Sequence, residues 1–313
     1  MKKALLLLAL CLCCCLTAQA DEASLSIMAV NFPAFDIARA IAGDQAEVRM
    51  LLPPGSESHS YEPTPQDIIA IQDADLFLYT GGDSDAWLED IVASMGDDAP
   101  RTFRLCDSVT LLHEETTESM EHRHKHDEHC EEEGHHHEEL DEHVWTSPKN
   151  VMLISQDLCH ALSAIAPESA AVFEANLADY LAELSALDRT FEEIVATGKR
   201  DLIIFGDRFP FRYFAAAYGL SYDAAFPGCS EDAEPSVRTV ISLVDEVRKH
   251  QIPVVFYIEF SSRRTADILC EETGAKPMLL HSCHNVSAEE IAEGATYLSL
   301  MKQNAQALKE ALN

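Results

Sequence analysis

The chain is short of positive charge. Of its 313 residues only 22 are lysine or arginine, against 54 aspartate or glutamate, and the formal net charge is −32. Proteins bind nucleic-acid backbones and anionic lipid surfaces through clustered cations, so the composition argues against both as partners. Glycine and proline, at 12 and 13 residues, are too few for a collagenous or low-complexity chain. The acidity is instead compatible with attracting cations.

Motifs of several enzyme classes are also missing. The sequence has no His-Glu-x-x-His zinc-protease motif, no Gly-x-Ser-x-Gly nucleophile elbow and no phosphate-binding P-loop. Aspartate, histidine and serine are abundant, but nothing in the sequence arranges them as a triad. We therefore expect a binding protein and not an enzyme, with an exported metalloenzyme as the alternative.

No apolar run reaches the roughly 20 residues that a membrane-spanning helix needs. Residues 1–20 have the pattern of a secretory signal peptide: Lys2 and Lys3, the apolar stretch Ala4–Leu16, and a small-x-small cleavage site at Ala18–Ala20. None of the cysteines in this stretch follows a small residue, as a lipobox requires. We expect soluble export to the periplasm or cell surface, with lipid anchoring as the alternative. Disulfides among the six remaining cysteines are permitted there.

Short β-rich apolar runs alternate with helix-like segments, which predicts an α/β fold with mainly parallel sheets. The expected strands form two sets of four. They are Ser26–Phe32, Glu47–Leu52, Asp75–Thr80 and Thr102–Leu105 in the first half, and Asp201–Phe205, Ser221–Phe226, Pro253–Ile258 and Pro277–Leu280 in the second.

Between the two sets lies a long helical pattern. Apolar residues recur at spacings of three and four from Val172 to Val195, while Pro167 and Glu168 suit the first turn and Gly198 suits the end. We expect two (β/α) lobes joined by a long rigid linking helix. The predicted divisions are a signal peptide at 1–20, an N-terminal lobe at 21–150, linking helices at 151–199 and a C-terminal lobe at 200–313.

One segment breaks this pattern. Nine of the 14 histidines lie between His113 and His143, among many acidic residues. The segment 113–142 has no apolar periodicity and is expected to be a mobile insertion that buries no core. A solvated acidic loop is one interpretation, but histidine at this density is typical of metal binding. We expect it to bind several ions weakly, and imidazole suits zinc, copper and nickel.

Two histidines stand at places suited to a fixed site. His59 lies in the loop that follows the second expected strand, after Pro53-Pro54-Gly55 and before a helix start at Thr64-Pro65. Open α/β sheets place their ligands at such carboxyl ends of strands. His143 lies where the acidic insertion stops, just before another helix start at Ser147-Pro148. Each could also be an ordinary histidine with no ligand role.

Several segments together carry a resemblance: GSESHSYEPTPQD, the acidic His-rich insertion, DEHVW followed by SPKN, the long linking helix, AEPS, VVFYIEFSS and ETGAKP. With these segments the chain resembles a known family, the zinc and manganese substrate-binding proteins of ABC importers (the cluster A-I solute-binding proteins). The similarity spans nearly the whole mature chain. The resemblance implies two lobes with a metal site between them and delivery of the metal to a membrane permease. It also implies that His59 and His143 are the two ligands of the N-terminal lobe.

The C-terminal lobe departs from the family pattern. Zinc-binding members usually carry a histidine after the first strand of this lobe, but here the sequence is Phe205-Gly206-Asp207-Arg208. By comparison with the family we expect His281 to supply the missing imidazole and Asp207 to be the oxygen donor. Glu259 and His284 are reserves, although Glu259 also suits an outer or capping role and Asp207 a local ion pair with Arg208. Cys229 and Cys283 are expected to form a disulfide, with thiolate ligation as the alternative.

The predicted function is that of an extracytoplasmic zinc receptor that passes Zn²⁺ to an ABC transporter permease and acts as a monomer. Closed ligands from two lobes trap a cation, whereas catalytic zinc needs an open position for water. A manganese receptor of the same family and a stand-alone zinc buffer remain alternatives. The His-rich insertion is expected to gather zinc near the site.

Overall fold

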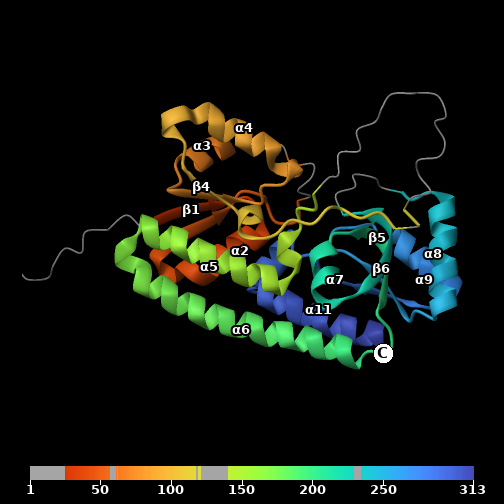
Figure 1. Cartoon of the computed structure of the whole chain (residues 1–313). Coiled ribbons are helices and arrows are strands. Elements are labelled where there is room, and N and C mark those ends of the chain that lie inside the picture. Colours follow the sequence, from red (N-terminus) through yellow and green to blue (C-terminus); the bar gives the residue numbers. More distant parts are fainter. Residues whose placement is uncertain (1–24, 57–60, 62, 118, 121–139, 229–233) are drawn as a thin grey trace, which may run out of the picture.

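The computed structural model describes residues 25–56, 61, 63–117, 119–120, 140–228 and 234–313. The eight predicted strands are present and form two four-stranded sheets (Figure 1). All pairs are parallel, so the predicted α/β class is confirmed. The first sheet has the order β2-β1-β3-β4 and the second β6-β5-β7-β8. Their bounds are β1 Leu25–Ala29, β2 Ala46–Met50, β3 Leu76–Tyr79, β4 Arg101–Arg104, β5 Leu202–Phe209, β6 Ser221–Pro227, β7 Val254–Tyr257 and β8 Lys276–Leu279.

Helices cover both sheets. They are α2 Phe32–Ala42, α3 Pro65–Gln72, α4 Ala86–Met95, α5 Pro148–Ile165, α6 Ala170–Thr197, α7 Arg212–Tyr218, α8 Val237–His250, α9 Arg264–Thr273, α10 Ala288–Ala292 and α11 Tyr297–Leu312. We call the first sheet with α2–α5 the N-lobe and the second sheet with α7–α11 the C-lobe. The predicted first strand was too long at its end, because Asn31 caps α2 by accepting a hydrogen bond from the Ala34 N–H.

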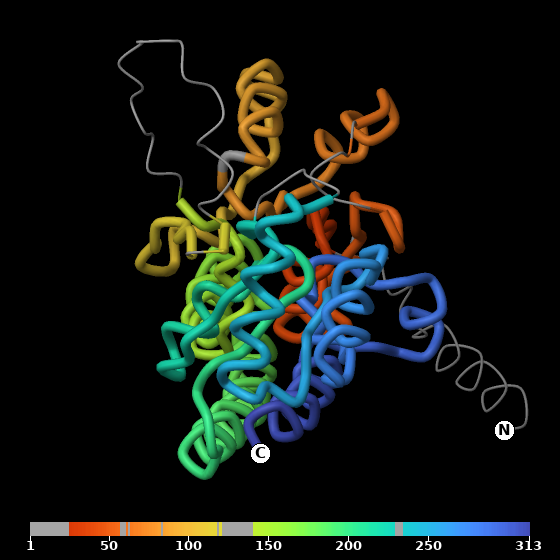
Figure 2. Tube along the Cα trace, turned by 90° about the vertical axis from the view of Figure 1, so that its right-hand side faces the viewer, coloured from red at the N-terminus to blue at the C-terminus, as the bar shows by residue number. Residues whose placement is uncertain are grey.

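The linking helix α6 was predicted from its apolar stripe, and the structure confirms it. A short 3₁₀ turn, Pro167–Ser169, precedes it and Gly198 is its C-cap. Figure 1 shows α6 running beneath both lobes, with α11 alongside it. Figures 1 and 2 both place the C-terminus beside the end of α6, where the Lys199 N–H donates to the Leu312 carbonyl at 2.8 Å.

One apolar core cluster runs through both lobes, and a smaller separate cluster lies in each lobe. The shared cluster includes Ile27 and Leu78 from the first sheet, Phe205 and Phe256 from the second, and one face of α6. The buried residues of that face are Phe173, Tyr180, Leu184, Leu187, Phe191 and Ile194. Because α6 contributes to the packing of both sheets, it is a structural member of each lobe and not only a connection between them.

The start of the acidic insertion differs from the prediction. Residues 113–117 and 119–120 pack on the C-lobe, where the hydroxyls of Thr117 and Ser119 donate to the Asp223 carboxylate on β6. Ser119 and Met120 are buried. The expectation that this stretch buries no core was wrong. The stretch is anchored by hydrogen bonds from hydroxyl groups to a buried carboxylate, and such contacts leave no apolar periodicity in the sequence from which they could be predicted.

Several predictions concern residues outside the described ranges. They are the signal peptide at 1–20, His59, Cys229 and positions 121–139 of the insertion. Among the helices of the described residues, none is long and apolar enough to cross a membrane.

Candidate metal site

A small cavity lies at the carboxyl ends of the strands, where open parallel sheets bind their ligands. Its volume is about 20 Å³, enough for one water-sized species and too small for an organic ligand. Its walls come from segments that follow β2, β6, β7 and β8, from the end of β5, and from His143. The lining residues are Ser56, His143, Arg208, Pro210, Gly228, Ile258, Glu259, Phe260, Ser282, His284 and Asn285.

His143 is held by its own short segment. It precedes a 3₁₀ turn, Val144–Thr146, and is 1% exposed. The carboxylate of Asp141 accepts the His143 backbone N–H at 2.8 Å and lies 3.2 Å from the ring Nδ1. A carboxylate on one ring nitrogen fixes the tautomer and leaves the other nitrogen as the metal-binding atom, which is the usual arrangement of histidine ligands. Nε2 of His143 is therefore the atom suited to a metal.

His284 comes from the opposite lobe and meets His143 in the cavity. The two ring centroids are 5.6 Å apart and the rings are nearly perpendicular. Trp145 packs against both rings, at 5.5 Å from His143 and 4.9 Å from His284. The indole N–H donates to the Ser282 carbonyl, which fixes the tryptophan of the N-lobe to the histidine loop of the C-lobe.

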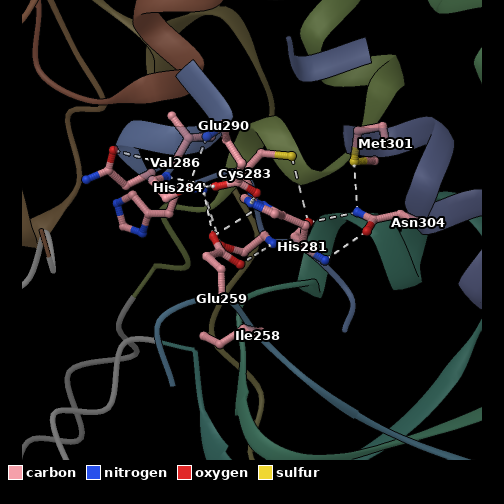
Figure 3. Close-up of polar contacts among 12 residues, drawn as sticks. Ile258, Glu259, His281, Cys283, His284, Val286, Glu290, Met301 and Asn304 are labelled. Carbon is pink, nitrogen blue, oxygen red and sulfur yellow. Dashed lines mark hydrogen bonds and ion pairs between the residues drawn. The ribbon is translucent and has the colours of Figure 1, made fainter. Parts of the chain in front are cut away.

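Glu259 holds the loop that carries His284. The carboxylate follows β7 and accepts from the backbone N–H groups of Ser282 at 2.7 Å and His284 at 3.2 Å. It also accepts from the Ser282 hydroxyl. Figure 3 shows these bonds converging on Glu259. Glu259 lines the cavity, yet its oxygens already bind the loop, so its geometry fits an outer role that orients the histidine.

His281 is buried beside the same loop but is not among the residues that line the cavity. Its Nδ1 lies 2.9 Å from the Cys283 backbone nitrogen, and its Nε2 lies 3.5 Å from Glu290 Oε1. Burial alone would lower the pKa of His281, but the charge of Glu259 and the interactions with Cys283 and Glu290 outweigh it and raise the pKa to about 11. In Figure 3 the His284 ring extends away from His281. The structure thus brings His284, and not His281, to His143.

Asp207 lies at the end of β5 and does not line the cavity. Its oxygens accept the N–H groups of Arg208 at 2.8 Å and Ile258 at 3.2 Å. Burial raises the pKa of this carboxyl, and its hydrogen bonds oppose the rise. This placement ties β5 to the segment after β7 and so supports the wall of the cavity.

A strained residue separates the two C-lobe histidines. Cys283 has φ 61°, in the left-handed region that residues other than glycine rarely adopt. Such outliers are typical of functional loops. Cys283 is a free thiol that is fully buried, so the disulfide that we expected between Cys229 and Cys283 is not formed. The side chain of Cys283 lies in the apolar core beneath the loop.

The described residues hold no group of three or more histidine, cysteine, aspartate or glutamate side chains placed to bind one metal ion. His143 and His284 supply two imidazoles. Ser56 also lines the cavity, and His59 follows it by three positions in the sequence. Three residues of chain span at most about 10 Å. The loop that contains His59 therefore begins at the wall of the cavity.

Charges around the cavity are mixed. A second small cavity, also about 20 Å³, lies on the N-lobe side of His284 and is lined by Glu142 and Asp85. Burial and the charge of Glu142 raise the pKa of Asp85 to about 6, against the hydrogen bonds that it accepts. Arg208 is the cation on the C-lobe wall. The buried acids favour a bound cation, whereas Arg208 opposes it.

The sequence predicted His143 as a residue of the site but ranked His284 behind His281. The other residues around the cavity have only weak sequence patterns that could have identified them. Asp141 stands two positions before His143, a spacing that lets a carboxylate reach the ring, while Trp145 and Asn285 drew no attention. Two larger hollows, of about 620 and 660 Å³, contain no histidine and lie on other faces.

Comparison with known proteins gives consistent matches. A family model described as zinc-uptake complex component A, periplasmic (ZnuA) matches residues 27–311. The zinc-binding lipoprotein AdcA of Streptococcus pneumoniae (strain TIGR4) is 33% identical over 315 residues, which cover 99% of this chain and 61% of AdcA. The chain thus spans less than two thirds of that relative.

In two further matches the alignment covers most of both proteins. The high-affinity zinc uptake system protein ZnuA of Bacillus subtilis is 30% identical over 288 residues, with 92% of this chain and 88% of the relative aligned. The crystal structure of the Zn(II)-bound ZnuA-like domain of Streptococcus pneumoniae AdcA has a TM-score of 0.75 and 28% identity, covering 92% of this chain and 99% of the domain. The shared fold extends over both lobes.

Proposed function

The chain belongs to the family of zinc-uptake complex component A proteins, and we propose that it is an extracytoplasmic zinc receptor that delivers Zn²⁺ to an ABC importer. The observation that carries this proposal is the meeting of His143 and His284, from opposite lobes, in a cavity sized for one ion. The Asp141 carboxylate behind His143 completes the pattern of a histidine ligand.

We propose His143, His284 and His59 as the zinc ligands. The first two line the cavity, and the reach of the chain from Ser56 supports the third. His281 and Asp207 were predicted as ligands from the family resemblance. Their hydrogen bonds favour supporting roles instead, with His281 behind the loop and Asp207 behind the C-lobe wall. Glu259 is proposed to orient His284.

The imidazole set favours zinc over manganese, because manganese prefers oxygen ligands. A receptor role is favoured over catalysis because no motif for a reacting group is present in the sequence and the cavity holds a single small species. The family description supports a periplasmic setting and transport, and binding to a permease separates a receptor from a stand-alone buffer. The proposed role of residues 121–139 is to gather zinc near the site.

Metal titration tests the proposal directly. Mature protein lacking residues 121–139 is titrated with zinc and manganese in competition with a chromogenic chelator. We expect one tight zinc site, with nanomolar affinity corresponding to about −12 kcal/mol, and much weaker manganese binding. Because imidazolium does not bind metal, the affinity should fall as the pH drops below about 6.5. Zinc binding that stays constant between pH 5 and 8 would contradict histidine ligation.

A further inference from the structure

Two loops meet at the cavity, one from each lobe. The loop after β2 is the turn Pro53-Pro54-Gly55-Ser56, and the loop after β8 ends with His284-Asn285-Val286. Ser56, His284 and Asn285 all line the cavity. The contact between these loops is therefore a direct connection between the N-lobe and the C-lobe at the edge of the site.

The turn at 53–56 has a defined geometry. The Ser56 N–H donates to the Pro53 carbonyl at 3.1 Å, and Gly55 has φ 80°. Proline at the second position and glycine with positive φ at the third are the signature of a type II turn. The turn directs its two outer carbonyls, those of Pro53 and Ser56, to the same neighbour across the interface.

That neighbour is the side-chain amide of Asn285, which is 2% exposed. Its Nδ2 donates to the Pro53 carbonyl at 2.8 Å and to the Ser56 carbonyl at 2.9 Å. Its Oδ1 accepts the Val286 N–H at 2.8 Å. The Gly55 N–H donates to the Val286 carbonyl at 2.8 Å. Three hydrogen bonds thus join the two loops, and two of them come from one buried side chain.

Only a primary amide supplies this pattern. Asparagine offers two N–H donors and a carbonyl acceptor, whereas an aspartate of the same shape is acceptor-only when ionised. An aspartate here would face two carbonyl oxygens with no hydrogen to offer them, so the Ser56 carbonyl would lose the Asn285 donor and the Pro53 carbonyl would keep only the Ser56 N–H, which is costly for buried groups. The identity of residue 285 therefore decides whether the turn at 53–56 stays against the His284 loop.

We propose that Asn285 is a positioning residue that holds the loop leading to His59 against the loop carrying His284, and so sets the geometry of the metal site across the two lobes. This inference rests on the proposed function, since it concerns how the zinc site is assembled. Asn285 binds no metal itself, because its amide is already committed to Pro53, Ser56 and Val286. Release of zinc by separation of the lobes requires these bonds to break.

The test replaces Asn285 with aspartate (Asn285→Asp) and measures zinc binding to the full mature chain. We expect the affinity to fall about 10- to 100-fold, the range seen when outer partners of metal ligands are lost, mainly through faster zinc dissociation. The matched control is Asn176→Asp. Asn176 also donates from Nδ2 to a carbonyl, that of Ile41 at 3.0 Å, but away from the cavity. It should lower stability without changing zinc affinity.

A double-mutant cycle separates positioning from general stability. In a His59→Ala background the Asn285→Asp change should alter zinc affinity by no more than about twofold, because the loop that it positions no longer carries a ligand. Full additivity of the two changes, or an Asn285→Asp protein that binds zinc as tightly and releases it as slowly as the wild type, would overturn the inference. A wild type that binds no zinc would overturn the proposed function instead.

A second variant covers the case in which Asn285→Asp does not fold. Gly55→Ala strains the turn from the N-lobe side, because Gly55 has a positive φ that alanine rarely adopts. The added Cβ would meet no atom within 4 Å, so the strain lies in the backbone and not in a steric clash. It leaves Asn285 intact and should show the same loss of affinity and the same dependence on His59. A Gly55→Ala protein with unchanged zinc affinity would count against the proposed coupling.

Discussion

His143 and His284 face each other in one cavity, but the two lobes hold them by different means. His143 is held in part by near neighbours in the sequence, because it hydrogen-bonds with Asp141 and Thr146. His284 is fixed by Glu259, which is 25 positions away, and its loop by Asn304 and by the turn at 53–56. The described hydrogen bonds of the proposed N-lobe ligand are thus local in the sequence, whereas those of the proposed C-lobe ligand come from distant segments.

This contrast predicts which substitutions matter most. His143→Ala and His284→Ala should each weaken zinc binding by more than about 100-fold, because each removes a proposed ligand and not merely an outer partner. His281→Ala is the matched comparison from the same loop and should cost less than His284→Ala, since Nε2 of His281 faces Glu290. Chelator competition measures all three. A larger loss for His281→Ala would reverse the assignment of the C-lobe ligand.

The outer carboxylates of the two lobes offer a second comparison. Asp141→Asn and Glu259→Gln should each reduce zinc affinity by about 10- to 100-fold. Only Glu259→Gln should also loosen the loop at 282–284, because the new amide group would face N–H donors now bound by carboxylate oxygens. Hydrogen exchange of that loop in the metal-free proteins measures the difference. Equal protection in both variants would mean that the loop does not depend on Glu259.

Two carboxylates should give opposite effects of pH on the free energy of unfolding. Burial raises the pKa of Asp36 to about 6 from 3.8, so its contribution is present below about pH 4 and lost as the pH rises to 6. The His281 ring and Ser287 lower the pKa of Glu290 to about 2 from 4.5, so its contribution is present above pH 4.5 and lost as the pH falls.

Urea unfolding of the metal-free protein between pH 3 and 7 checks both signs. Relative to the wild type, Asp36→Asn should gain stability as the pH rises from 4 to 6, with a slope of at most about 1.4 kcal/mol per pH unit. Glu290→Gln should lose relative stability as the pH rises from 3 to 5, by less, because Glu290 is partly exposed and its charge is screened. Curves parallel to the wild type would contradict the assigned shifts.

The smallest effect is expected on the surface of the C-lobe. Glu234 pairs with Arg264, and both side chains are 71% exposed. Glu234→Gln should change the free energy of unfolding by less than about 0.5 kcal/mol and leave zinc affinity unaltered. Thermal unfolding and chelator competition test both points. A marked loss of affinity would show that charges outside the two histidine loops help to set the site.

The same contrast explains how much could be predicted from the sequence. Strand runs, helix caps such as Thr64 and the stripe of α6 depend on neighbours in the sequence, and all three are confirmed. His143 was placed by its own motif. The choice between His281 and His284 depends on the positive φ of Cys283 and on the bonds of Glu259 and Asn304, which no local pattern encodes. The anchoring of Ser119 on Asp223 was missed for the same reason.

The core that runs through both sheets has a practical consequence for expressing the protein as fragments. Expressing either half alone would leave the apolar face of α6 without one of its partners, and the fragment would be expected to aggregate. A cut made within residues 121–139 of the already folded protein should instead leave both sheets packed on α6.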